Sequence, residues 1–227
     1  MSVMQDAEGV IKYSLKHTQK SLDASLFYKE DQYHPYFQEL LEARFLLYKL
    51  GLIGQKQDLY GGLAYGNLSS RAPIVPKSPA ERAFLISATQ TGNIEKPRKE
   101  HFVLVTKWNV TQNMLYSEGE RKPSSEALTH AILYETNPNI QAIIHIHSSI
   151  LWNHYRDLGM LATPKEAEYG TVKMANEMVK IAEKQDRGIV AMLGHQDGIL
   201  AFSSEMKDAL FLILEVFATS EILFNHG

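Results

Sequence analysis

Two histidines separated by one residue, His145 and His147, stand at the end of the apolar run QAIIHIHS. Alternate side chains of a β-strand point to the same face, so the two imidazoles would lie side by side. Ile144 and Ile146 would then point to the opposite face, toward the core. Two adjacent imidazoles can bind one metal ion, but two histidines on the solvent face of a strand would give the same pattern.

A third candidate metal ligand, His195, lies in the segment MLGHQDG, directly after another apolar run. The glycines on both sides allow a sharp backbone turn, and a sheet can bring the ends of its strands together. Three neutral imidazoles leave a divalent ion with its full charge and one open position, which is typical of a catalytic zinc site. A turn histidine that binds no metal is the alternative.

Glu126 is the candidate acid or base, in the segment PSSEALTH at the start of a predicted helix. A carboxylate in a first helical turn can complete a capping box and interact favourably with the helix dipole, which requires no function. Beside a metal ion, the same carboxylate could ligate the ion, be displaced by substrate and then transfer a proton. His130, one helical turn later, is the other histidine that we single out.

Three short segments of small residues could bind an anion: GNLSS at 66–70, TQTG at 89–92, and the serines at 124 and 125. Backbone N–H groups and hydroxyls in turns and at helix N-termini bind phosphate and carboxylate groups. Ordinary turn chemistry also explains each of these segments taken alone.

The elements that must position these residues follow from the hydrophobic pattern. Apolar runs predict strands over 83–87, 101–110, 141–148, 188–193 and 198–202, with an edge strand over 113–119. Helical spacing predicts helices over 35–51, 123–136 and 203–224, and over most of 164–188. Strand runs and hairpins outnumber β–α alternation, which favours a mixed or antiparallel sheet flanked by helices. The last helix is apolar nearly all round, so it would be buried or lie at a subunit contact.

Composition limits the class of protein. The chain has 227 residues, a net charge of −3 and no cysteine. This length suits one domain, here residues 34–227. The N-terminal extension, residues 1–33, has no clear hydrophobic period, so it would either pack on the surface of that domain or be disordered. Cysteine-based sites are excluded, and no charge excess indicates nucleic acid or a membrane surface. Without a signal-peptide pattern or a membrane-length apolar run, a soluble cytoplasmic protein is expected.

In chain order the motifs are G-N-x-S, T-G, P-S-S-E, H-I-H and L-G-H-x-x-G. This order resembles the class II aldolase/adducin family over roughly residues 36–224. That family includes fuculose- and rhamnulose-phosphate aldolases, ribulose-phosphate 4-epimerase, a methylthioribulose-phosphate dehydratase and aromatic decarboxylases. The resemblance implies one α/β domain with a mainly antiparallel β-sheet, flanked by helices on both faces.

The resemblance also implies a role for each motif. His145, His147 and His195 look like three zinc ligands, and Glu126 looks like the acid/base that closes the metal shell when no substrate is bound. The positions that match the substrate-phosphate loops are Gly66, Asn67, Thr91, Gly92, Ser124 and Ser125.

The chain departs from the family pattern at three places that bear on the site. The N-terminal extension is longer than in the minimal members and could cover the site. The segment ISATQTG is longer than its family counterpart, so Thr89 could replace Thr91 in the anion loop. In fuculose-phosphate aldolase a tyrosine donates a proton across the subunit contact. This chain has no secure equivalent, and Tyr155 and Tyr169 are the candidates.

The function implied is that of a zinc-dependent lyase, most simply an aldolase acting on a small sugar or sugar phosphate. Metal charge would stabilise the enediolate left by retro-aldol cleavage, and Glu126 would shuttle the proton. A dehydratase, decarboxylase or epimerase could use the same site, although the epimerases carry Asp at the position of Glu126. A non-catalytic, adducin-like interaction module would lack the three histidines. Family members are usually homotetramers with sites at subunit interfaces.

Overall fold

The computed structural model describes residues 10–71 and 83–224 of the chain. Nine strands form the main sheet: β1 (Ser14–Gln19), β6 (Asn67–Arg71), β7 (Phe84–Ser87), β8 (Phe102–Asn109), β9 (Met114–Gly119), β10 (Ala142–His147), β11 (Leu161–Glu168), β12 (Gly188–Gly194) and β13 (Gly198–Ser203). Their order is β1-β9-β8-β7-β6-β10-β13-β12-β11. The two outermost pairs are parallel and all inner pairs are antiparallel. The predicted mainly antiparallel sheet is therefore confirmed.

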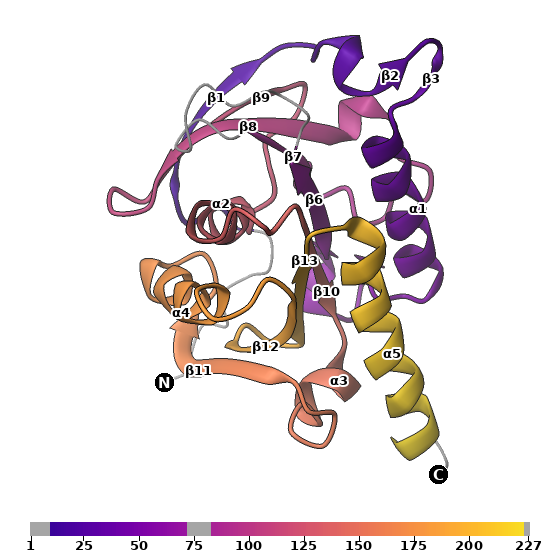
Figure 1. Cartoon of the computed structure of the whole chain (residues 1–227), viewed down its shortest axis with the longest axis vertical. Coiled ribbons are helices and arrows are strands. Elements are labelled where there is room, and N and C mark those ends of the chain that lie inside the picture. Colours follow the sequence, from indigo (N-terminus) through magenta and orange to yellow (C-terminus); the bar gives the residue numbers. More distant parts are fainter. Residues whose placement is uncertain (1–9, 72–82, 225–227) are drawn as a thin grey trace.

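Helices cover both faces of this sheet (Figure 1). On one face, α1 (Pro35–Lys49), α3 (Ser149–Asn153) and α5 (Met206–Phe224) pack over an apolar cluster that includes Ile144 and Ile146 of β10. On the other, α2 (Ala127–Thr136) and α4 (Val172–Ala182) pack over a second cluster that includes Ile143. The central strand β10 is thus buried on both sides, as its run of isoleucines requires.

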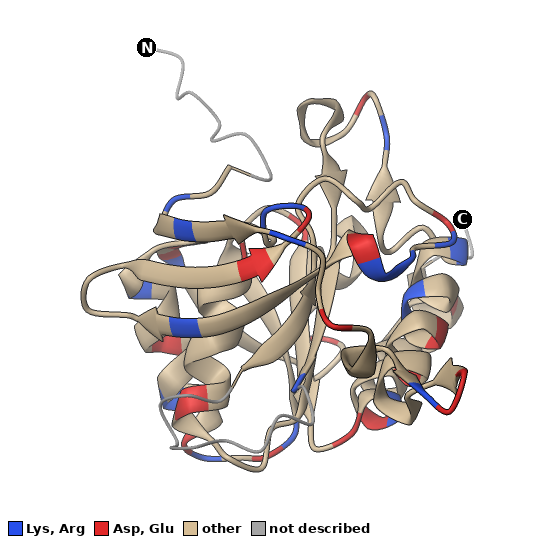
Figure 2. Ribbon diagram, turned by 90° about the horizontal axis from the view of Figure 1, so that it is seen from above, with Lys and Arg blue, Asp and Glu red and all other residues tan. Residues whose placement is uncertain are grey.

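Smaller elements complete the described part of the chain. They are the 3₁₀ turns η1 (Ala24–Leu26), η2 (Tyr60–Gly62) and η4 (Lys99–His101), and the two-stranded pairs β2 (Tyr28–Lys29) with β3 (Gln32–Tyr33) and β4 (Gly54–Gln55) with β5 (Ala64–Tyr65). Lys/Arg and Asp/Glu are interspersed over the elements in Figure 2. No helix in the described part of the chain is long and apolar enough to cross a membrane.

The predicted N-terminal extension packs directly on the domain, as far as residues 10–33 show. Its strand β1 pairs in parallel with β9, so β9 is not the edge strand that we expected. Leu22, Leu26 and Phe27 then enter the apolar cluster beneath α1. The sequence shows no hydrophobic period in this segment because β1 is short and mostly exposed. Residues 1–9 lie outside the described part.

The prediction of helix over most of 164–188 is wrong for its first part. Strand β11 extends to Glu168, and α4 begins only at Val172, after Gly170 in a left-handed conformation. The backbones of β11 and β12 approach closely at Gly194, where a Cβ atom would lie 1.9 Å from the carbonyl oxygen of Ala167. Parallel pairing with β12 holds the segment extended despite its helical composition.

Candidate active site

Three histidines converge in the interior: His145 and His147 from β10, and His195 from the turn between β12 and β13. One ring nitrogen from each lies within 4.8 Å of the corresponding atoms of the other two. The Nε2 atoms of His145 and His147 are 3.1 Å apart. All three side chains are buried, so the geometry brings together the residues that the sequence proposed as ligands.

The local sequence explains this convergence. His147 pairs with Gly198 across β10 and β13, at the end of the β12–β13 hairpin that carries His195. A Cβ atom at residue 198 would lie 3.0 Å from both Cγ and Nδ1 of His195 and 3.2 Å from Cε1 of His145. Glycine at position 198 therefore gives the two imidazoles room to approach each other.

The protonation states suit metal binding. The Nδ1 atom of His145 lies 3.1 Å from the carbonyl oxygen of Ile199, a contact in which Nδ1–H donates and Nε2 remains available as a ligand. Burial, and then the neighbouring histidines, lower the pKa of His145 and His147 well below their usual value. Neutral imidazole is the form that coordinates a metal ion, so these donors fit a divalent cation such as zinc.

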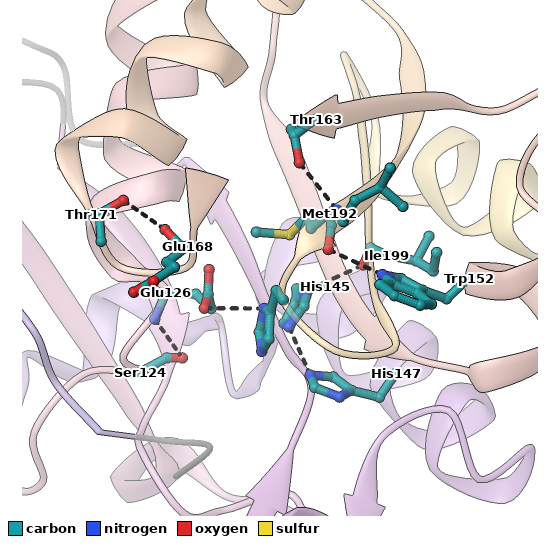
Figure 3. Close-up of polar contacts among 12 residues, drawn as sticks. Ser124, Glu126, His145, His147, Trp152, Thr163, Glu168, Thr171, Met192 and Ile199 are labelled. Atoms are coloured by element: carbon teal, nitrogen blue, oxygen red, sulfur yellow. Dashed lines mark hydrogen bonds and ion pairs between the residues drawn. The ribbon is translucent and has the colours of Figure 1, made fainter. Parts of the chain in front are cut away.

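Glu126 faces this histidine cluster from the N-terminus of α2. Its Oε1 atom is 3.6 Å from Nδ1 of His195, and its side chain makes no capping hydrogen bond. The capping explanation is therefore not supported, and the backbone N–H of Glu126 instead donates to the hydroxyl of Ser124. In Figure 3, Ser124 and Glu126 lie on one side of the site, and His145 and His147 lie on the other. A buried carboxylate so placed can exchange a proton with a group bound at the histidines.

A narrow hollow lies next to this cluster. Its lining residues are Ala64, Gly66, Asn67, Ala88, Thr89, Gln90, Thr91, Gly92, Ser124 and Ser125. All six residues that we expected to hold an anion are among them, and Thr89 and Thr91 both line the hollow. Asn67 pairs with His145 in the sheet, and Ser125 precedes Glu126, so the hollow adjoins the histidine site.

A second, open groove of about 540 Å³ reaches the site at His147. Sequence reasoning missed two of its residues, Tyr60 and Asp197, whose side chains form a 2.8 Å hydrogen bond. Both adopt left-handed backbone conformations, with φ of 51° and 61°. The ring of Tyr60 also packs against that of His147 at a centroid distance of 4.6 Å. The signal in the sequence was weak, because DLYGG and HQDG look like ordinary turns.

The two candidate proton donors are placed differently. Tyr169 stacks on His195 with ring centroids 4.4 Å apart, and the ammonium group of Lys12 lies 4.2 Å from the centre of the Tyr169 ring. Tyr155 instead accepts a hydrogen bond from Arg156 and packs against the apolar cluster under α5. Of these two tyrosines, the fold brings only Tyr169 to the histidine cluster.

A family profile described as "Class II Aldolase and Adducin N-terminal domain" matches residues 55–224, three quarters of the chain. The chain belongs to this class II aldolase family. The match begins after α1 and includes the three histidines, Glu126 and every residue of the hollow. The resemblance carried by the motif order is thereby confirmed at the level of the family and its fold.

Relatives of this class II aldolase family member have related but differing activities. It is 30% identical over 112 residues to a probable L-ribulose-5-phosphate 4-epimerase of Mycoplasma pneumoniae, a match over 49% of this chain and 38% of that protein. The chain thus aligns with well under half the length of this relative. The fold is similar to those of a sugar-phosphate aldolase from Thermotoga maritima (TM-score 0.63, 19% identity, 83% and 93% of the two chains). It is also similar to an L-fuculose-1-phosphate aldolase from Thermus thermophilus (TM-score 0.57, 16% identity, 84% and 93%).

Proposed function

We propose that this protein is a zinc-dependent lyase that cleaves or forms a carbon–carbon bond in a small sugar phosphate. The observation that carries the proposal is the shared location of three buried histidines, the Glu126 carboxylate and the hollow of small polar residues. Membership of the class II aldolase family supports an enzyme of the aldolase or epimerase type.

The chain's own residues divide the work between binding and proton transfer. Hydroxyls and backbone N–H groups of the hollow would bind the phosphate of the substrate and thereby fix its carbon chain relative to the histidines. The histidines would hold the cation, which when bound supplies Lewis-acid stabilisation of negative charge on substrate oxygen atoms. Glu126 would take a proton from the substrate and return it to the carbon that lost its bond.

A sugar-phosphate epimerase is the second candidate, favoured by the 30% identity to the Mycoplasma protein. The Glu126 side chain weighs against it, because the family resemblance implies the shorter aspartate at this position in epimerases. Both reactions would use the same metal ligands and the same hollow. In the epimerase reaction the broken carbon–carbon bond forms again before the product leaves, whereas in the lyase reaction the two fragments are released.

We also propose that the protein is a homo-oligomer, on the expectation of a tetramer with sites at subunit interfaces. The support from this chain is the surface of α5, where Phe211, Ile222 and Leu223 are 59%, 65% and 56% exposed. Large apolar side chains grouped on one helix are typical of a surface that another molecule covers. Light scattering coupled to size exclusion would give the mass directly.

The deciding experiment is a substrate panel on zinc-loaded protein. L-Fuculose 1-phosphate and other ketose 1-phosphates, L-ribulose 5-phosphate, the corresponding unphosphorylated sugars and small carboxylic acids would be compared, with products identified by NMR. An aldehyde plus a three-carbon phosphate would support the lyase. A stereoisomer of the pentulose phosphate would support the epimerase, and turnover of none of the sugar phosphates would refute both.

A further inference from the structure

Arg44 is a buried cation on α1, and the histidine site does not explain why a charged side chain is buried at this position. Its residue exposure is 1%, and burial lowers its pKa to about 10. The guanidinium donates to the carbonyl oxygen of Ile94 at 2.5 Å and to that of Thr91. No carboxylate among the described residues forms an ion pair with it. A buried guanidinium held only by neutral carbonyl groups is costly, which indicates a further anionic partner.

Both carbonyl groups belong to the loop that forms one wall of the anion hollow. Thr91 and Gly92 line the hollow, and the Thr91 carbonyl also accepts the N–H of Ile94, which closes a tight turn. Arg44 therefore bonds the rear of this wall, while its front faces the hollow. The two hydrogen bonds join the loop to α1 and so fix its position.

The rest of the loop is held just as closely. A Cβ atom at Gly92 would lie 2.4 Å from the carbonyl oxygen of Gly54 and 2.8 Å from that of Tyr65. The side chain of Gln90 accepts the backbone N–H of Ala64 at 3.0 Å. No backbone N–H of residues 90–92 donates to another described residue. Amides in such a turn can bind an anion that enters the hollow.

The hollow itself has no charged lining residue in the part of the chain that the structure describes. Hydroxyls and backbone N–H groups bind anions, but without a full charge they discriminate only partly between a phosphate and a neutral hydroxyl group of a sugar. The fixed charge of Arg44 behind the 91–94 turn favours binding of an anion over a neutral group, because its electric field is weakly screened in the protein interior.

We propose that Arg44 is a positioning residue that acts through the 91–94 turn and makes the hollow selective for a phosphate group. The substrate phosphate is then the counter-ion of Arg44 across the loop. This inference rests on the proposed function only in taking the hollow as part of the substrate site. Arginine suits the role better than lysine, because its planar fork holds two carbonyl groups at once and keeps its charge when buried.

The test uses inorganic phosphate as the probe and does not require turnover. Isothermal titration of the zinc-loaded, 227-residue protein would give the phosphate dissociation constant for wild type, Arg44→Gln and Arg44→Lys. Arg71→Gln is the matched control, because Arg71 also donates to main-chain carbonyls, those of Tyr134 and Asn137, at the far end of α2. Zinc content and thermal unfolding of each variant would be measured in parallel.

We expect Arg44→Gln to weaken phosphate binding by roughly tenfold or more, the effect of losing a hydrogen-bonded charge. Arg44→Lys replaces the planar fork that spans both carbonyls with a compact ammonium group, so a smaller loss of about threefold is expected. Arg71→Gln should bind phosphate as wild type does. With an identified substrate, KM for the phosphorylated form should rise in Arg44→Gln while kcat changes little.

Two results would overturn the proposal: wild-type protein that does not bind phosphate, or phosphate binding unchanged in a folded Arg44→Gln. If that variant does not fold, unchanged binding in Arg44→Lys overturns it equally. Failure of the proposed function is distinguishable from these results. A protein that binds phosphate through Arg44 but turns over no sugar phosphate would retain this inference and lose the proposed reaction.

Discussion

The carboxylate of Glu126 lies 3.6 Å from Nδ1 of His195, and both side chains are buried. The two residues come from different elements, Glu126 from the start of α2 and His195 from the β12–β13 turn. A glutamate that only capped its helix would turn its side chain toward the free N–H groups of the first turn. This one faces the histidine cluster, which is the arrangement expected of an acid or base that works beside a metal ion.

Substituting Glu126→Gln should leave zinc bound and lower kcat by about 10² to 10⁴, the usual contribution of a positioned acid or base. The amide keeps the size of the side chain but cannot accept or return a proton. Activity would be measured on whichever substrate the panel identifies, and zinc by elemental analysis. Glu135→Gln is the control, because Glu135 lies on the same helix and accepts a hydrogen bond from Trp108. Wild-type kcat in Glu126→Gln would remove this residue from the mechanism.

His145→Ala should abolish stoichiometric zinc binding while the protein stays folded. The remaining two histidines cannot complete a three-nitrogen site, and the substitution leaves a cavity but no buried charge. Elemental analysis of protein purified without an affinity tag, together with circular dichroism, gives both results. His154→Ala, at the end of α3, should keep zinc. One zinc per chain in His145→Ala would show that the ligand assignment is mistaken.

Gly198→Ala tests whether close packing positions the candidate metal ligands. Its methyl group would lie 3.0 Å from the ring of His195, so that ring must move and zinc affinity should fall by about 10- to 100-fold. Gly188→Ala is the control for destabilisation alone, since its Cβ atom would lie 2.8 Å from Phe202, at the end of the β12–β13 hairpin away from His195. Competition with a chelator measures zinc affinity in both. Equal affinities in the two variants would contradict the packing argument.

Local patterns were sufficient to predict the parts of the site that depend on short-range geometry. The alternation in QAIIHIHS placed His145 and His147 on one face of β10, and the glycine-flanked turn placed His195 at the end of a hairpin. These predictions succeed because strand periodicity and hairpin pairing act over a few residues.

Long-range contacts were not predictable from such patterns. Arg44 lies about one helical turn before the end of α1 and gives no sign in the sequence that it bonds the Thr91 turn. The segment over 161–168 has a helical composition, yet pairing with β12 makes it a strand. In both cases a residue far along the chain determines the outcome, and tertiary contacts override local propensity.

Stability at low pH should depend on His130, which is fully buried on α2 and lies 2.7 Å from the hydroxyl of Ser69 through its Nδ1 atom. Burial lowers the pKa of His130 from 6.5 to about 3. Between these values the unfolded chain binds a proton that the folded protein does not, so stability is lost as pH falls below 6.5. The residue should contribute a slope of up to about 1.4 kcal/mol per pH unit.

The measurement is urea unfolding of zinc-free protein between about pH 4 and pH 6, with wild type compared with His130→Gln. The variant should be less stable near neutral pH, because glutamine does not reproduce the bond to Ser69, but its stability should fall less steeply with acid. His145 and His147 titrate in the same direction and remain in both proteins, so the difference in slope reports His130 together with its electrostatic effect on His145. His154→Gln, on the surface, serves as the control. Parallel curves for wild type and His130→Gln would mean that this imidazole is already protonated in the folded protein, or that its site admits water.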